Sequence, residues 1–421
     1  MALAAVSLAW LVVLALIVSR RIFVSHDTIS NYSHVWYVAR EIWHHQNLPF
    51  HMPVIGHGQA YAFPYGFLPW FVGAVLYPLL GDWGVTFLIV VGAVTLITST
   101  FVAFPELRSG FGPVVVLLNP SVIGAVVIGQ LPYLWAASLL MFAIAAWRRD
   151  RVVLAIVLAA VAQLTHAAMV MPITAILVAG YLPFTTRRKE LVRAYLISAV
   201  IAIPGAIMVW ISPVFAEASA ATRTIAFGET LLERIMVFAV PLLALALLRL
   251  PRARLALGVL AVAMVAWQLV FFNISSEVSG LRLVFADRKS SVPELTRSGD
   301  LRPGRMYRVL ANDHKVAMYE ALRNGARLDS EFFPESINPR RWKSVHDYRS
   351  FLEERGIESI VLFRSYGGPD GRNERALLRR ITLAPGDACT PGLPYATTTQ
   401  RRRSYDLVAI RRCGLDGHVA A

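Results

Sequence analysis

The chain has 421 residues, of which 56% are hydrophobic and only 16% are charged. Soluble domains carry roughly a quarter charged residues, so this composition excludes an ordinary soluble protein and places most of the chain in lipid. A net charge of +14 often indicates nucleic-acid binding. Here much of it lies in short loops between apolar segments, where basic residues set membrane topology. We therefore expect a multi-pass protein of the plasma membrane, in contact with membrane lipids and without a nucleic-acid partner.

Residues 2–18 form an uncharged apolar segment that is just long enough to cross a bilayer. A cleaved signal peptide is the competing interpretation. It is disfavoured because no basic residue precedes the segment and no small-residue cleavage site follows it. We predict a first span that is retained.

An amphipathic helix is predicted shortly after this span, between Ile29 and Trp43. A helix with one apolar and one polar face beside a span lies in the membrane interface. This arrangement places Asp27 at the membrane surface, just before the helix. The predicted apolar face is Ile29, Tyr32, Val35, Trp36, Ala39, Ile42 and Trp43, and the polar face includes Asn31, His34, Arg40, Glu41, His44 and His45.

Residues 67–80 are also apolar, but a helix of this length reaches only about 21 Å, short of the roughly 30 Å hydrocarbon core. We predict a second interfacial or half-buried helix on the same side as Asp27. Further spans are predicted at about 84–104, 112–128, 131–147, 152–167, 168–183, 191–211, 231–249 and 254–272, so that a polytopic α-helical protein with about nine spans is expected.

The basic loops test this count, because Lys and Arg are retained on the cytoplasmic side. When the spans alternate, four basic loops fall on one side; they contain Arg108, then Arg148, Arg149 and Arg151, then Arg187, Arg188, Lys189 and Arg193, and finally Arg249, Arg252 and Arg254. The N-terminus is thus expected in the cytoplasm, and the first loop, residues 20–83, outside. Arg20 and Arg21 then also lie outside, where they bind lipid phosphates, unless the natural chain begins upstream of Met1.

The sequence becomes polar and Arg-rich from about residue 282, which indicates a water-exposed domain. We expect residues 1–272 to form the membrane domain and residues 273–421 an extracytoplasmic α/β domain. Its predicted helices are 313–324 and 344–355, the second opening at Ser344 and stopping before Gly356, and its predicted strands are 306–310, 357–363 and 405–410.

The two cysteines, Cys389 and Cys413, both fall in this outer domain. Disulfides persist outside the cytoplasm, so we expect a bridge that closes a loop of about 25 residues and stabilises the domain by roughly 3 kcal/mol. Two free thiols are the alternative.

Five short stretches occur in an order typical of a known enzyme family. They are Ser25-His26-Asp27, Leu48-Pro49, Ala62-Phe63-Pro64-Tyr65-Gly66, Asn119-Pro120 and Gly129-Gln130. An acid after the first span, interfacial helices and an outer C-terminal domain accompany them. With these features the chain resembles the C-type glycosyltransferase superfamily, whose members are polytopic enzymes that take sugar from a polyprenyl-phosphate carrier at the outer membrane face. The resemblance covers about residues 1–272.

The resemblance implies that Asp27 is the general base that takes the proton of the acceptor hydroxyl. The alternative is that Asp27 only caps the helix beginning at Thr28, because Asp is a preferred N-cap residue; one residue can do both. The expected substrate-binding residues are His26, His34, Tyr65, Gln130, His166 and Arg223.

Two of these residues have a simpler explanation. His166, at the outer end of a span, either faces a cavity or reaches to the interface. Arg223, in the outer loop of residues 212–230, either binds phosphate or is a solvated loop charge. Six of the ten histidines lie between residues 26 and 57, and we expect them to be solvated at the interface and not to form a metal site. No cofactor is assigned, and a requirement for a divalent metal stays open.

The expected function is transfer of a sugar from a polyprenyl-phosphate carrier to a glycan, lipid or protein acceptor of the cell envelope. The alternative is a non-enzymatic protein on the same scaffold, either a lipid or glycan transporter or an assembly partner. The family often has two acids in the first loop where this chain has His26-Asp27, which favours the alternative. Spans 84–104 and 131–147 contain no charge and span 254–272 has only Arg254 at its end, whereas transporters carry ionisable groups at membrane depth, which favours the enzyme.

The topology leads to a first prediction. Reporter fusions are expected to place residues 148–151 in the cytoplasm and residue 340 outside, because the four basic loops share one side. Finding the two positions on the same side of the membrane would contradict the nine-span arrangement.

Overall fold

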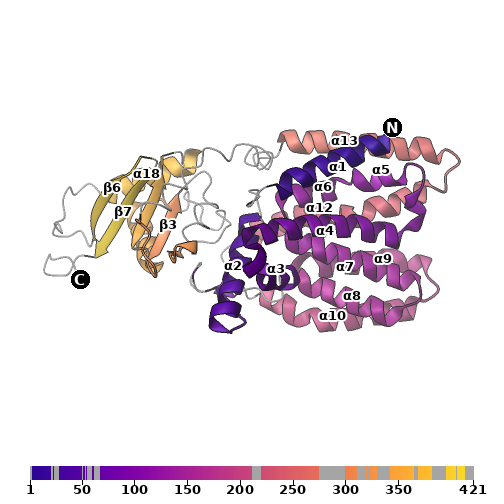
Figure 1. Cartoon of the computed structure of the whole chain (residues 1–421), viewed down its shortest axis with the longest axis horizontal. Helices are drawn as coiled ribbons and strands as arrows, with labels where there is room; N and C mark the ends of the chain where they lie inside the picture. The colour runs from indigo at the N-terminus through magenta and orange to yellow at the C-terminus, as the bar shows by residue number, and fades with distance from the viewer. Residues whose placement is uncertain are drawn as a thin grey trace. The chain divides into compact units, whose positions relative to one another are not determined.

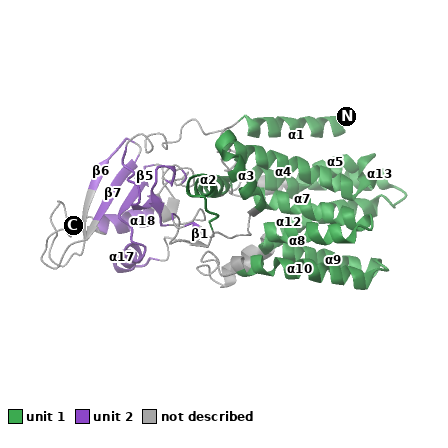
Figure 2. Ribbon diagram, turned by 60° about the horizontal axis from the view of Figure 1, so that its bottom comes forward, with its two compact units in different colours: residues 1–50, 60–286 green, residues 51–59, 287–421 purple. Residues whose placement is uncertain are grey.

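The computed structural model describes residues 2–19, 22, 28–49, 51, 52, 54, 59, 60, 67–210, 220–274, 299–310, 319, 322–329, 342–364, 368–381, 395–403 and 405–412. The chain divides into two compact units, residues 1–50 with 60–286, and residues 51–59 with 287–421 (Figure 2). Cys389 and Cys413 lie outside the described residues, so the disulfide stays a prediction.

The first unit is a bundle of helices whose bounds follow the predicted segments closely, except that α12 begins at Ala220. Residues 220–230, predicted as part of an outer loop, are therefore helical, because the helical hydrogen-bond ladder continues beyond the apolar stretch that hydropathy detects. Four of the described helices are long and apolar enough to cross a membrane, at Asp82–Ala103, Leu131–Arg148, Ala167–Phe184 and Arg188–Ile207. The helices are α1 (Ala2–Val18), α2 (Thr28–His45), α3 (Phe67–Leu80), α4 (Asp82–Ala103), α5 (Gly112–Leu117), α6 (Pro120–Ile128), α7 (Leu131–Arg148), α8 (Val152–Thr165), α9 (Ala167–Tyr181), α10 (Arg188–Trp210), α12 (Ala220–Leu247) and α13 (Ala253–Ile274).

The centre of this bundle is the close packing of α4 against α7, with α8 and α10 following on the far side of α7 (Figure 1). The Trp135 indole N–H donates to the carbonyl of Leu88 at 3.1 Å. A Cβ at Gly92 would lie only 2.9 Å from the Trp135 ring, so a glycine is needed where the two helices meet. Small residues at such contacts let membrane helices approach closely.

Three of the predicted basic loops meet at one end of the bundle. We call this end the basic end and define it by Glu106, Arg148, Asp150 and Arg187. Arg148 bonds to the carbonyl of Ala103 and to Glu106, and Arg187 bonds to Asp150. The short helix Pro105–Arg108, the end of α7 and the start of α10 therefore share this end. Their shared location supports the predicted loop parity; which membrane face it occupies stays a prediction.

Two interior prolines break the hydrogen-bond ladder of their helices, and each freed carbonyl has a new donor. Pro78 in α3 has no N–H for the carbonyl of Ala74, which instead accepts from the Trp43 indole of α2 at 3.0 Å. Pro241 in α12 similarly frees the carbonyl of Val237, which accepts from the Asn119 amide at 3.4 Å. The bond from Trp43 fixes α2 to α3, and the bond from Asn119 fixes the residue before α6 to α12.

The span predicted at 112–128 is in fact two helices. Asn119 interrupts it: its side-chain oxygen accepts from the Ser121 N–H at 3.1 Å and so caps α6, and Pro120 occupies the first turn. Asn followed by Pro is a strong local signal for a helix start. The Asn119 amide donates to the carbonyls of Met236 (3.2 Å) and Val237 (3.4 Å), the second of which Pro241 left without its helical donor.

The second unit contains a five-stranded sheet in the order β4-β3-β5-β7-β6, in which β3, β4 and β5 are parallel and β7 and β6 are antiparallel. Its outermost strand β4 also bonds to the segment that follows α2, because the Leu328 N–H donates to the carbonyl of Val54 at 2.8 Å. The strands are β1 (His51–Met52), β2 (Gln59–Ala60), β3 (Met306–Leu310), β4 (Arg327–Leu328), β5 (Ser359–Phe363), β6 (Tyr395–Arg401) and β7 (Tyr405–Arg412).

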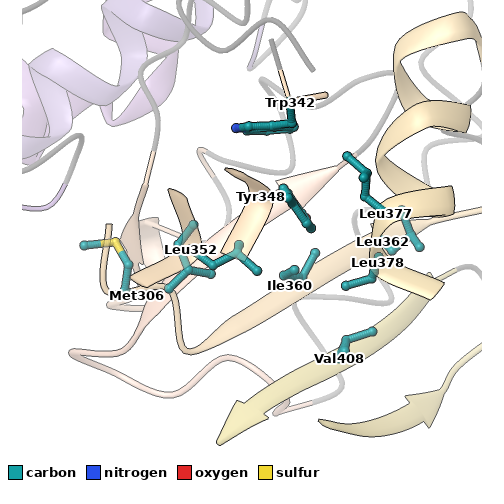
Figure 3. Packing of buried hydrophobic residues seen from close by; sticks show 10 residues of the cluster. Met306, Trp342, Tyr348, Leu352, Ile360, Leu362, Leu377, Leu378 and Val408 are labelled. Atoms are coloured by element: carbon teal, nitrogen blue, oxygen red, sulfur yellow. The ribbon is translucent and has the colours of Figure 1, made fainter. Parts of the chain in front are cut away.

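Helices α17 (Val345–Glu354) and α18 (Gly368–Ile381) pack on one face of this sheet, as the predicted α/β character requires. The predicted start at Ser344 is confirmed: Ser344 and Asp347 form a reciprocal capping box. Figure 3 shows the apolar side chains that helices and strands bury together; they are Met306, Trp342, Tyr348, Leu352, Ile357, Ile360, Leu362, Leu377, Leu378 and Val408.

A buried ionic cluster crosses this core. Arg308 of β3 binds Glu374 of α18 with two nitrogens, at 2.5 and 3.0 Å, and Asp329 with a third at 2.7 Å. The Trp342 ring lies 5.3 Å from the guanidinium. Tyr348 donates to Glu374, and burial beside that carboxylate raises the pKa of Tyr348 well above its ordinary value.

Removing the Arg308 guanidinium from this cluster is expected to destabilise the second unit. Arg308→Met leaves the buried carboxylates of Glu374 and Asp329 without the cation that binds both of them, which typically costs about 3–5 kcal/mol. Denaturant unfolding of the full chain in detergent, followed by fluorescence, measures the loss. Arg305→Met is the matched control, because Arg305 is half-exposed and lies 3.6 Å from Glu358, a pair worth less than about 1 kcal/mol. Equal costs for the two variants would contradict the assignment.

Candidate functional site

The structure describes three of the predicted site residues with their side chains, namely His34, Gln130 and His166. Asp27, His26 and Tyr65 lie outside the described residues, and for Arg223 only the backbone in α12 is described. The roles of these four residues therefore remain predictions.

The first turn of α2 is fixed to the rest of the unit by Asn31. Its amide N–H donates to the carbonyl of Gly129 at 2.8 Å, and its side-chain oxygen accepts from the Trp70 indole at 2.8 Å. Trp70 in turn stacks on His34, with ring centroids 4.1 Å apart. The sequence predicted a polar, solvated face for Asn31, but the residue is 2% exposed because both halves of its amide have protein partners.

The Gly129-Gln130 turn joins α6 to α7. Gly129 ends α6 in the left-handed conformation (φ 75°), which a glycine adopts without strain. Gln130 is the N-cap residue of α7, and its Oε1 is buried without a hydrogen-bond partner among the described residues. The turn thus brings a buried amide oxygen beside the helix that begins directly after Asp27.

One turn into α7, Tyr133 connects this turn to two other helices. Its hydroxyl donates to the carbonyl of Arg234 in α12 at 2.6 Å, and the Arg234 guanidinium lies 5.0 Å from its ring. The ring of His166, between α8 and α9, meets Tyr133 edge-on at 5.8 Å. We call Asn31, Gln130, Tyr133, His166 and Arg234 the polar cluster.

Arg234 and its neighbour Glu233 are the functional candidates that sequence reasoning missed. Arg234 is 5% exposed and pairs with Glu233 at 3.0 Å, inside the predicted span 231–249. A Cβ at Gly124 would lie 3.3 Å from the Glu233 carboxylate, so α6 leaves room for this acid. Two adjacent charges in an otherwise apolar span were the available signal, because ionisable residues at membrane depth are rare and mostly functional.

The polar cluster and the basic end lie at opposite ends of α7. Tyr133 stands one turn after the start of this 18-residue helix, and Arg148 is its last residue. At 1.5 Å per residue the helix is about 27 Å long, close to the thickness of the hydrocarbon core. The cluster and the basic end are therefore separated along α7 by about the thickness of a hydrocarbon core.

Glu41 is the acidic residue within α2. It pairs with Arg40 at 2.9 Å and with His45 at 3.1 Å, and 12% of its side chain is exposed. These partners account for Glu41 without a catalytic role. Among the described residues no group of three or more histidines, cysteines or acids is placed to hold a metal ion.

Comparison with known proteins finds a similarity in structure and none in sequence family. No family model matches the chain, and no curated protein matches it. The chain is similar to the crystal structure of ArnT from Cupriavidus metallidurans bound to undecaprenyl phosphate, with 16% identity, a TM-score of 0.46, and coverage of 95% of this chain and 98% of that chain. Because the TM-score is below 0.5, this similarity carries no weight in the functional proposal.

The hydrogen bond from Asn119 to the Val237 carbonyl of α12 is expected to matter because Pro241 leaves that carbonyl without a helical donor. Asn119→Ala is expected to cost about 1 kcal/mol for the lost cap of α6 and a further 1–3 kcal/mol, roughly, for the buried Val237 carbonyl. In a Pro241→Ala background α12 has its own donor for Val237, so that only the cap term remains. Unfolding of the four proteins in mixed micelles gives the coupling energy. Purely additive effects would mean that Asn119 does not serve this carbonyl.

Proposed function

We propose that the chain is a membrane glycosyltransferase that moves a sugar from a polyprenyl-phosphate carrier to a cell-envelope acceptor at the outer membrane face. The observation that carries this proposal is the buried Arg234–Glu233 pair beside Tyr133 and His166. A cation held at the membrane face opposite the basic end suits an anionic lipid head group. By the positive-inside rule that face is the outer one.

In the proposed reaction the acceptor hydroxyl attacks the anomeric carbon of the donor sugar. Its proton passes to the Asp27 carboxylate, the ordinary type of general base for this step. The bond between the anomeric carbon and the phosphate oxygen breaks, and the polyprenyl phosphate leaves with the bonding electrons. Asp27 directly precedes Thr28, the first residue of α2, and α2 is the helix that Asn31 holds against the Gly129-Gln130 turn.

The leaving phosphate gains negative charge in the transition state, and fixed cations stabilise such charge most effectively where water is excluded. We assign this role to Arg234, with His166 and His34 as hydrogen-bonding groups for the donor and Gln130 for its sugar hydroxyls. Arg223, eleven residues before Arg234 in α12, stays a candidate for the same phosphate. The second unit is proposed to bind the acceptor glycan or polymer.

A non-enzymatic transporter of lipid or glycan is the second candidate, and one observation favours it. Transporters place ionisable residues within their spans, and Glu233–Arg234 is a charged pair inside the predicted span 231–249. In a transporter the pair would bind a head group that crosses the membrane unchanged. Release of free polyprenyl phosphate together with sugar-modified acceptor separates the two functions.

Asp27→Asn tests the proposed base. Asn caps a helix nearly as well as Asp but does not accept the proton, so membrane insertion and melting temperature are expected to stay nearly unchanged while sugar transfer falls by about 10²–10⁴-fold. Transfer from a polyprenyl-phosphate-linked sugar in vesicles is the measurement.

Glu41→Gln is the matched control, since it makes the same change from acid to amide in α2, the helix that follows Asp27, and lies outside the polar cluster. It is expected to keep parental transfer. If Asp27→Asn transfers sugar at close to the parental rate, Asp27 is only a helix cap and the base lies elsewhere.

A further inference from the structure

We propose that Asn31 is a positioning residue that sets the orientation of α2, and with it of Asp27, relative to the Gly129-Gln130 turn. The proposal rests on the proposed function and identifies a residue that acts through others, without touching the reacting atoms. The supporting observation is that the Asn31 side-chain amide bonds to two separate elements. Its oxygen accepts from Trp70 in α3, and its nitrogen donates to Gly129 in the turn between α6 and α7.

The chemistry of the amide makes this bridge directional. Asn31 donates through Nδ2 to the Gly129 carbonyl and accepts at Oδ1 from the Trp70 indole, both at 2.8 Å. A carbonyl requires a donor and an indole N–H requires an acceptor, so only a side chain with both, in a fixed plane, satisfies the two partners. Because Asn31 is 2% exposed, water does not replace either bond.

The bridge acts on the right part of the helix. Asn31 lies in the first turn of α2, whose first residue, Thr28, directly follows Asp27 in the sequence. The hydrogen-bond partner of Asn31, Gly129, directly precedes Gln130 and lies four residues before Tyr133. Gln130 and Tyr133 both belong to the polar cluster. A rotation of the first turn of α2 therefore breaks a bond to the turn that carries Gln130.

A neighbouring bond provides a matched comparison. The Tyr32 hydroxyl and Thr86 hydroxyl are hydrogen-bonded at 2.5 Å, which joins α2 to α4. Tyr32 is fully buried, as Asn31 nearly is, and adjacent to it in the same turn. The Tyr32 bond leads to α4 and not to the Gly129-Gln130 turn, so its loss tests for general loosening of α2.

The experiment compares Asn31→Ala, Trp70→Phe and Tyr32→Phe in the full chain reconstituted in vesicles. Trp70→Phe removes the indole donor but keeps an aromatic ring against His34. A displacement of about 1 Å at a reacting group costs about 10²-fold in rate. Asn31→Ala is therefore expected to lower kcat by about that factor with the donor KM unchanged, and Trp70→Phe by a smaller factor in the same direction. Tyr32→Phe is expected to keep the parental kcat.

Amide hydrogen exchange of residues 28–36 is the second measurement, and it does not depend on catalysis. Faster exchange there in Asn31→Ala, with α4 and α7 unchanged, supports the bridge. Parental kcat in Asn31→Ala, or an equal loss of kcat in Tyr32→Phe, overturns the positioning role while the proposed function stands. If the parental chain transfers no sugar, the proposed function fails. If Asn31→Ala then also shows the parental rate of amide hydrogen exchange at residues 28–36, the proposed structural role of Asn31 fails as well.

Discussion

A backbone polar group inside a bilayer has no water to bond with, so the protein itself has to supply the partner. In the first unit this requirement is met across helices. Pro78 and Pro241 each free a carbonyl, and Trp43 and Asn119 on neighbouring segments donate to them. A break in one helix therefore fixes a polar side chain on another, and the packing of the bundle follows from where the ladders are interrupted.

The same requirement concentrates polar chemistry where helices begin, end or break. Asn31 serves the carbonyl of Gly129, at the end of α6, and His166 stands between α8 and α9. Arg234 is held beside these ends by the hydroxyl and the ring of Tyr133. The groups proposed for donor binding are thus ones that lie at helix ends and breaks in the bundle. Structural and proposed chemical roles overlap there because both need polar atoms held inside an apolar bundle.

The second unit obeys different rules, because its sheet can lie in water. It nevertheless buries Arg308 between two carboxylates, an arrangement that holds β3, β4 and α18 in register and is costly to leave half-made. This unit also includes residues 51–59, between the two helices α2 and α3 of the first unit. The chain thus links the unit proposed for acceptor binding directly to the segment that leaves α2.

The sequence alone determined the local structure of this protein: α3 at Phe67–Leu80, the Ser344 cap of α17 and the strand at Met306–Leu310 lie where hydropathy and capping residues predicted them. It also contained the signal for the break at Asn119-Pro120, which a hydropathy window averages away. Only the tertiary structure decided that Asn31 is buried, because its partners Gly129 and Trp70 are 98 and 39 residues distant along the chain. The same holds for Arg234, whose charge was visible but whose place beside Tyr133 was not. Helical periodicity depends on near neighbours, whereas the partners of a polar side chain depend on which distant segments the packing brings together.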